Sequence, residues 1–161
     1  MLDKTDIKIL NILQSNGKIS NAELARLIGM APSGVLERVK KLEQKGIIQG
    51  FEVRLNPKAL GISLSTFIQI KTSDSVGSSD IGRQIAAFPE VQEVHWTAGE
   101  YNYLVKARVS GTDTLTILMK KFGEIPGVRD SRTTLVLDTL KETQALSMDF
   151  VKCRQPKKSP K

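Results

Sequence analysis

The second half of this 161-residue chain contains an internal repeat with an offset of 37 residues, and the repeat limits its possible folds more than any other feature. The segment Phe88-Pro89-x-Val91 matches Ile125-Pro126-x-Val128 without a gap. Earlier apolar positions match in the same register: Phe67 with Leu104, Ile81 with Leu118, and Ile85 with Phe122. Each copy has the pattern strand, helix, strand. Such a unit used twice is the split βαβ, or ferredoxin-like, arrangement.

The repeat predicts a βαββαβ domain over residues 64–142 in a chain of the α+β class. We expect strands over 65–71, 91–96, 101–109 and 128–137, and helices over 79–88 and 113–123. A turn at Ala98-Gly99-Glu100 joins the second and third strands.

Residues 2–46 have helical spacing instead. The first predicted helix ends in the Ser15–Lys18 stretch. The second starts at Ser20, where Glu23 three residues later suggests a capping box, and it ends at Gly29. The third opens at Pro32 and stops near Gly46. Two extended pieces around Gly50 follow. We therefore predict a winged helix-turn-helix, with its helical domain at 1–50 and a β-wing or linker at 51–63.

The third predicted helix has a polar outer face, opposite a core face formed by Val35, Val39 and Leu42. In a helix-turn-helix the last helix enters the major groove, where Arg and Lys reach guanine or phosphate and Glu accepts from cytosine. The start of the second helix is placed to hold a phosphate. The alternative interpretation is a merely solvated charged face. The candidate DNA-binding residues are Ser20, Asn21, Ser33, Gly34, Glu37, Arg38, Lys40 and Lys41.

The net charge of +7 is unevenly distributed. Residues 1–60 hold 10 Lys and Arg against 6 Asp and Glu, residues 61–150 hold 9 against 11, and residues 151–161 hold 5 against none. A basic first part points to a polyanion such as nucleic acid or an anionic membrane surface. Residues 143–161 are predicted as an extension that ends in a basic, disordered tail, which either adds weak, salt-sensitive attraction to DNA or has no function.

Other classes of site find little support. His95 and Cys153 are the only His and Cys, and they are too far apart in the chain to suggest a metal set or a catalytic pair. We interpret His95 and Trp96 as packing residues. Nucleotide-binding and hydrolase motifs are absent, as are a signal peptide and a run of ~20 apolar residues. We expect a cytoplasmic protein that is not an enzyme and needs no cofactor or metal.

The sequence also resembles a known family over about residues 1–142. The stretch "ISNAELARLIGMAPSGVLERVKKLEQKG" is similar to the DNA-binding half of the leucine-responsive regulatory protein/AsnC (Lrp/AsnC) transcription regulators. The segments "AGEYNYLV" and "IPGVRDSRTTLVL" resemble the signature places of that family's effector domain. The resemblance implies binding of double-stranded DNA, a homodimer formed by pairing the ferredoxin-like sheets, and often larger rings. It also implies a small-molecule effector, usually an amino acid, where subunits meet. Its candidate contacts are Gly99, Glu100, Tyr101, Asn102, Thr133 and Thr134.

Two positions depart from the family pattern. Ala31 stands where the family commonly has Ser, so the third helix lacks its usual N-cap. Asn102 stands where the family commonly has Asp, whose carboxylate could pair with an ammonium group. We therefore expect a weak response, or none, to common free amino acids.

Three classes of function remain open from the sequence. The first is a ligand-responsive transcription regulator. The second is an architectural DNA-binding protein whose second domain only multimerises. The third is a small-molecule-binding or metabolic module whose helical part binds protein.

Overall fold

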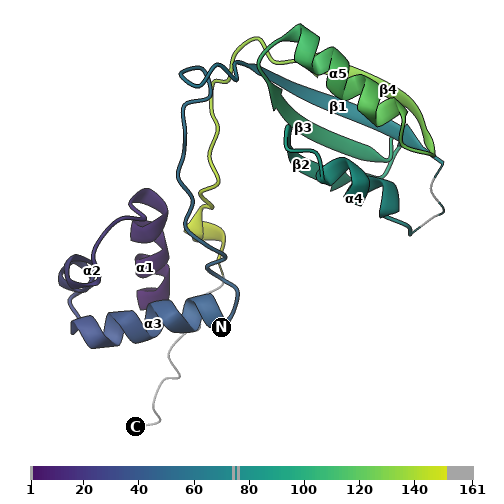
Figure 1. Ribbon diagram of the computed structural model, residues 1–161. Coiled ribbons are helices and arrows are strands. Elements are labelled where there is room, and N and C mark those ends of the chain that lie inside the picture. Colours follow the sequence, from purple (N-terminus) through teal and green to yellow (C-terminus); the bar gives the residue numbers. More distant parts are fainter. Residues whose placement is uncertain (1, 74, 76, 152–161) are drawn as a thin grey trace. The chain divides into compact units, whose positions relative to one another are not determined.

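The computed structural model describes residues 2–73, 75 and 77–151, and they divide into two compact units (Figure 1). One, here called the helical unit, comprises residues up to Val53 together with those from Glu142 onward. The other, here called the sheet unit, comprises Arg54–Lys141.

The helical unit contains α1 (Lys4–Ser15), α2 (Asn21–Ile28) and α3 (Pro32–Gln44). All three predicted helices are confirmed, and Gly29 ends α2 in a left-handed conformation with φ of 78°. One apolar side chain from each helix, Ile9, Leu24 and Val35, is completely buried in the shared core. The three helices therefore stabilise one another through a single small core.

A full capping box starts α1, where none was predicted. Asp3 accepts a hydrogen bond from the Asp6 amide at 2.8 Å, and the Asp6 carboxylate accepts from the Asp3 amide at 3.0 Å. At the predicted box, Ser20 does accept from the Glu23 amide at 3.2 Å. The Glu23 carboxylate, however, lies 3.8 Å from Arg26 on the same helix.

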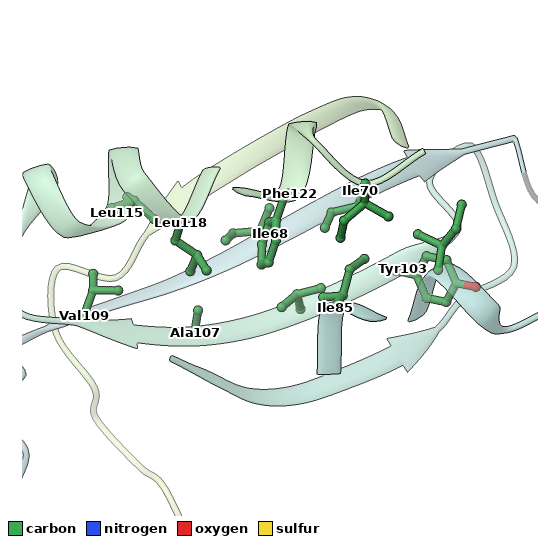
Figure 2. Packing of buried hydrophobic residues seen from close by; sticks show 12 residues of the cluster. Ile68, Ile70, Ile85, Tyr103, Ala107, Val109, Leu115, Leu118 and Phe122 are labelled. Carbon is green, nitrogen blue, oxygen red and sulfur yellow. The ribbon is translucent and has the colours of Figure 1, made fainter. Parts of the chain in front are cut away.

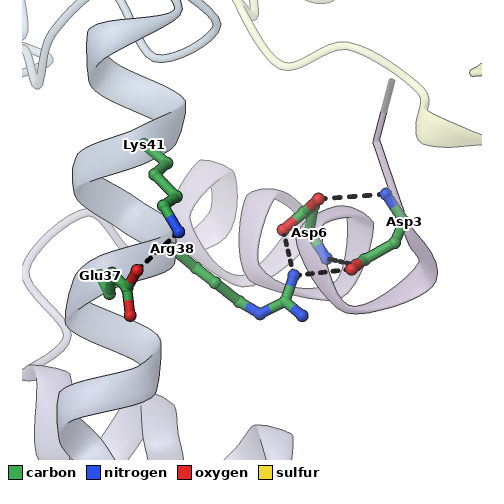
Figure 3. A network of polar contacts seen from close by, with 5 residues as sticks. All are labelled: Asp3, Asp6, Glu37, Arg38 and Lys41. Carbon is green, nitrogen blue, oxygen red and sulfur yellow. Dashed lines mark hydrogen bonds and ion pairs between the residues drawn. The ribbon is translucent and has the colours of Figure 1, made fainter.

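Arg38 links α3 to the start of α1 (Figure 3). Its Nη1 donates to the carboxylates of Asp3 and Asp6, each at 2.7 Å, and its side chain is only 31% exposed. Burial raises the pKa of Asp3, but hydrogen bonds from the Asp6 amide and from Arg38 outweigh it and hold that pKa below its ordinary value. The two carboxylates also offset the positive end of the α1 dipole, beside which the Arg38 cation lies.

The sheet unit is a four-stranded antiparallel sheet in the order β2-β3-β1-β4. Its strands are β1 (Leu64–Thr72), β2 (Val91–Trp96), β3 (Tyr103–Val109) and β4 (Val128–Leu135), and its helices are α4 (Asp80–Ala86) and α5 (Thr112–Gly123). The chain order β1-α4-β2-β3-α5-β4 confirms the ferredoxin-like prediction.

Both helices pack on one face of the sheet, and the apolar core lies between this face and the helices (Figure 2). Gly82 of α4 allows a close approach, because a Cβ there would lie 2.5 Å from the Tyr103 ring. In the repeat register Met119 of α5 corresponds to Gly82 of α4, and Tyr103 of β3 corresponds to Thr66 of β1. Both larger side chains therefore come from the second copy of the repeat, so the two copies contribute unequally to the core.

The segment predicted as a β-wing or linker, residues 51–63, forms no strand pair in the described chain. Residues 47–63, all of which the structure describes, contain no strand. Phe51, Val53 and Leu55 alternate as in a strand, but their side chains are exposed. An extended segment becomes a strand only when a neighbour pairs with its N–H and C=O groups, and no strand in the described part of the chain pairs with this segment.

The segment after the sheet unit returns to the helical unit, a contact that was not predicted. The Gln14 side chain donates to the Leu146 carbonyl at 3.1 Å and accepts from the Leu146 amide at 2.6 Å. Met148, which begins the short 3₁₀ helix η1 (Met148–Phe150), packs against the helical core. Residues 152–161 and Cys153 lie outside the described residues, so the disorder of the tail stays a prediction.

Arg38→Ala should lower the free energy of unfolding by about 1 kcal/mol at pH 7, because partial exposure reduces the roughly 1.5–3 kcal/mol of charged hydrogen bonds. The pKa of Asp3 is lower in the folded than in the unfolded state. The contribution of the Arg38 bonds to stability is therefore fully present above the pKa that Asp3 has in the unfolded chain, and it is lost as pH falls through the pKa of Asp3 in the folded protein. The gap between natural protein and variant should therefore close below about pH 4. Urea unfolding followed by circular dichroism over pH 2.5–7 (about the range in which Asp titrates) measures it.

Lys41→Ala is the matched control, since it removes an exposed i,i+4 pair with Glu37 from the same helix. Such pairs contribute little, and we expect almost no change in stability. Equal losses in the two variants, or a gap that does not depend on pH, would contradict the role given to Arg38.

Candidate nucleic-acid interface and effector site

The outer face of α3 carries exposed polar side chains, as predicted. Ser33, Glu37, Lys40 and Lys41 all project into solvent. Ser20 and Asn21, at the start of α2, are exposed as well. α2 and α3 pack against each other through buried Leu24 and Val35, so the two groups belong to one rigid helix pair.

The first turn of α3 consists of small residues and has no side-chain cap. Ala31 provides no side-chain cap, which confirms the prediction for that position. Packing does not require glycine at position 34, since a Cβ there would make an ordinary contact of 3.4 Å with the flexible Met30 methyl. The small side chains of this turn let the backbone of α3 approach another molecule closely, although Pro32 has no N–H and the Gly34 amide donates to the Ala31 carbonyl at 3.0 Å.

Among the charged residues of α3, Arg38 and Lys41 differ in how they are held (Figure 3). Arg38 is bound by two carboxylates of the α1 start, so in this structure it is not free to reach a base edge or a phosphate. Lys41 donates to Glu37 at 2.6 Å on the exposed face, and that hydrogen bond holds the pKa of Glu37 below its ordinary value. A weak surface pair of this kind can exchange partners when a polyanion arrives.

The predicted effector loop lies beside the end of β1. The Asn102 amide donates to the Ile70 carbonyl at 2.9 Å, and Asn102 Oδ1 accepts from the Thr72 amide at 2.8 Å. The Asn102 side chain was expected to face a ligand, but its oxygen takes the place of a strand neighbour for β1. It therefore fixes the loop to the sheet.

Two partners of this loop were not found from the sequence. The Glu100 carboxylate lies 3.5 Å from Lys71 Nζ, and the Tyr101 hydroxyl lies 3.5 Å from the Asp130 carboxylate. Lys71 and Asp130 are register partners on β1 and β4. Lys71 and Asp130 come close to the loop only because of the strand order, and the spacing of residues along the chain does not predict this. Gly99, in the same loop, has φ of 146°, which favours glycine.

The structure separates Thr133 from Thr134, which were predicted to serve one site. Thr133 pairs with buried Ile68, and its hydroxyl contacts Met119 Sδ of α5 at 3.8 Å. Thr134 pairs with Phe67 and points to the opposite face of the sheet. Successive strand residues cannot contact the same ligand from one face, so only one of the two can belong to a site there.

The sheet face not covered by α4 and α5 is here called the free sheet face. Its side chains alternate with the core residues of the strands and are Phe67, Gln69, Glu93, His95, Leu104, Lys106, Arg108, Arg132 and Thr134. Lys106 donates to Glu93 at 3.0 Å, and this bond, followed by one from His95, holds the pKa of Glu93 below its ordinary value.

His95 and Trp96 are not packing residues, which corrects the prediction. The Trp96 side chain is 59% exposed, and His95 is exposed beside Glu93 at 3.1 Å. Both lie at the end of the edge strand β2, where the register places His95 on the free sheet face and Trp96 on the helix face.

Two negative findings concern the described residues. They contain no group of three or more His, Cys, Asp or Glu placed to hold a metal ion. No helix over 2–73 or 77–151 has both the length and the apolar character needed to cross a membrane.

Comparison with known proteins gives consistent relatives for both units. Residues 2–49 match the family described as winged helix-turn-helix DNA-binding, and residues 65–146 match the Lrp/AsnC ligand binding domain. The leucine-responsive regulatory protein of Haemophilus influenzae is 40% identical over 150 residues, which cover 90% of this chain and 89% of that protein.

Two solved structures are similar over nearly their whole length. A transcriptional regulator of Neisseria meningitidis, crystallised with L-Met, has a TM-score of 0.86 at 31% identity. The match covers 92% of this chain and 98% of the chain of that regulator. A feast or famine regulatory protein of Mycobacterium tuberculosis, complexed with L-methionine, has a TM-score of 0.84 at 31% identity, with 91% and 99% covered. With the sheet topology and the helix-turn-helix already described, these matches show that the chain belongs to the Lrp/AsnC family of DNA-binding transcription regulators.

Proposed function

We propose that this chain regulates transcription by sequence-specific DNA binding through α3, as a homo-oligomer whose DNA affinity responds to a small molecule. The exposed, partly basic face of α3 on a helix-turn-helix is the observation that carries the proposal. No catalytic role is assigned. Because such a regulator binds chromosomal DNA, we propose that it acts in the cytoplasm.

On DNA, Lys40 and Lys41 contact guanine edges or phosphates, and Glu37 accepts from a cytosine amino group once Lys41 leaves it. Ser33 and Gly34 allow α3 to enter the major groove with its first turn close to the bases. Ser20 and Asn21 hold a phosphate at the start of α2. Arg38, held by Asp3 and Asp6, instead fixes the angle between α1 and α3.

The free sheet face pairs two subunits. It carries the exposed aromatic ring of Phe67 and half-buried Leu104 among ion-paired charges, a mixture typical of surfaces that bind another protein. A second helix-turn-helix supplied by a partner matches the two half-sites of a palindromic operator. Larger rings of dimers are compatible with this arrangement.

A small molecule that carries an amine and a carboxylate, such as an amino acid, binds between subunits at the loop of Gly99, Glu100, Tyr101 and Asn102. Thr134 is on the same sheet face, four residues along β4 from the loop partner Asp130, and contributes from there. Loop amides and the Tyr101 hydroxyl supply the few convergent polar groups that such a site needs. The L-methionine complexes of the two relatives support this class of ligand. A ligand that bridges subunits shifts DNA affinity only through its differential affinity for two assemblies.

Lys40→Ala and Lys41→Ala should each weaken DNA binding. If the lysine contacts a base, its loss should cost roughly 1–3 kcal/mol of binding free energy and relax the sequence specificity. If it contacts a phosphate, its loss should lower the slope of log Kd against log salt concentration by about 1. Fluorescence anisotropy with DNA from upstream of the protein's own gene and with a scrambled duplex measures both quantities. Lys120→Ala, an exposed lysine on α5 of the sheet unit, is the control and should change neither. Identical behaviour of all three variants would remove α3 from the interface.

Phe67→Lys should dissociate the oligomer, because it places a cation in the middle of a buried interface. Light scattering of the full chain at micromolar concentration should give at least a dimer for the natural protein and a monomer for the variant. Ile117→Lys is the matched control on the outer side of α5, and it should leave the assembly intact. A monomeric natural protein, or equal effects of both changes, would rule out pairing through the free sheet face.

Asn102→Asp should strengthen amino-acid binding more than tenfold, since one carboxylate oxygen still accepts from Thr72 while the other pairs with the ammonium group, a charged hydrogen bond of roughly 1.5–3 kcal/mol. Calorimetric titration of both proteins with a panel of amino acids measures the gain. In the Asp background, Thr134→Val should reduce binding, whereas Thr133→Val, on the α5 side, should not. Tight binding to the natural protein that Asp weakens would reverse our interpretation of the site. No binding to either protein would favour an architectural, ligand-independent role.

A further inference from the structure

We propose that the groove beside Gly34 is a subsite for the C5-methyl group of a thymine, so that α3 selects thymine at one position of each DNA half-site. The inference rests on the proposed DNA binding by α3 and deepens it, because it names a base that the helix selects. It follows from a glycine for which the fold gives no reason and from the groove into which that glycine opens.

Gly34 has neither a conformational nor a packing reason to be glycine. Its φ is not positive, unlike that of Gly29 and Gly46, and its amide donates to the Ala31 carbonyl as in any helical turn. A Cβ at this position would make only an ordinary contact of 3.4 Å with the Met30 methyl. Among all residues only Pro is a poorer helix former than Gly. Alanine would therefore fit and would stabilise α3, so the missing Cβ leaves space that the fold itself does not use.

That space opens into a groove along α3 with a volume of about 350 Å³. Met30 and Leu42 line the groove together with Gly34. A thioether is at most a weak hydrogen-bond acceptor and a leucine side chain has no hydrogen-bonding group. A small apolar group fits this part of the groove, whereas a polar group would lose its hydrogen bonds to water there.

Thymine is the base that offers such a group. In the major groove the other three bases present only hydrogen-bond donors and acceptors, and thymine adds its C5-methyl. Gly34 lies in the first turn of α3, and the N-terminal residues of a recognition helix are those that contact base edges. The position of the free space and its apolar lining therefore both favour thymine.

The polar side chains of the groove are largely neutralised among themselves (Figure 3). Asp6 pairs with Arg38 at 2.7 Å, and Glu37 pairs with Lys41 at 2.6 Å. All four line the groove, so neither a free carboxylate nor a free cation among them attracts a charged ligand to its middle. This part of the groove accepts a neutral base edge without a charge mismatch.

Lys45 lines the groove beyond Lys41, and no ion pair within the described residues involves it. It lies eleven residues after Gly34, about 16 Å along the helix axis at 1.5 Å per residue. That distance exceeds the ~8.5 Å depth of the major groove. With Gly34 at the base edges, Lys45 lies at the mouth of the major groove and contacts a phosphate. A DNA strand therefore satisfies both ends of the groove.

The test replaces thymines by deoxyuridine, which pairs in the same way but lacks the methyl group. The duplex comes from upstream of the protein's own gene, each thymine is replaced in turn, and fluorescence anisotropy gives Kd. The natural protein should lose roughly fourfold in affinity at one position of each half-site, the factor for one buried methyl group. Gly34→Ala should bind the thymine duplex more weakly and lose this difference, because its own methyl group fills the subsite.

Two variants serve as comparisons. Gly123→Ala changes another helical glycine, at the end of α5, where a Cβ would meet nothing within 4 Å, and it should change neither affinity nor thymine preference. Lys45→Gln should lower the slope of log Kd against log salt concentration by about 0.9 for each subunit and leave the thymine preference intact. Urea unfolding should show Gly34→Ala to be at least as stable as the natural protein, so that misfolding does not explain its weaker binding.

The outcomes separate this proposal from the main one. If the natural protein binds the thymine and deoxyuridine duplexes equally at every position, the subsite is refuted while DNA binding by α3 stands. The subsite is also refuted if Gly34→Ala keeps the full preference for thymine, or if its affinity for the thymine and deoxyuridine duplexes falls by the same factor. If the natural protein binds no DNA, the proposed function fails and the subsite fails with it.

Discussion

The alternation of side chains along β1 and β3 governs the rest of the sheet unit. Ile68, Ile70 and Val105 point to α4 and α5 and are completely buried, and their neighbours in sequence therefore have to point the other way. Because both helices of the repeat lie on the same face, no helix or strand among the described residues covers the second face. The same parity sends Thr133 to α5 and Thr134 to the free sheet face. One geometric rule thus produces a core and an open surface.

Most secondary structure could be predicted because its signals are local. Gly29 and Gly46 end helices through left-handed conformations, Pro32 starts one, and the two copies of the repeat have their strands and helices where spacing placed them. The choice between β-wing and linker stayed open in the sequence for the opposite reason. A strand depends on a neighbour, and the pattern of Phe51 and Val53 carries no information about whether one is present.

The candidate sites were predicted less completely, because their details depend on contacts between residues far apart in the chain. A helical wheel places Arg38 on the flank of α3 but does not reveal the two carboxylates of α1 that bind it. In the same way Asn102 was recognised from its place in the loop, whereas its hydrogen bond to the Thr72 amide requires the strand register. Partners of this kind distinguish a charge that holds the fold from one that is available to a ligand.

The bond between Gln14 and Leu146 also means that the chain passes between the two units twice, once outward and once back. A single linker would act as a swivel and let the helical unit turn freely about its own attachment. Two attachments oppose such turning, because each full turn would wind the two connecting segments around each other. In a symmetric dimer of such chains the two helical units would sample fewer relative orientations. The dimer could then span only a narrower range of distances between DNA half-sites.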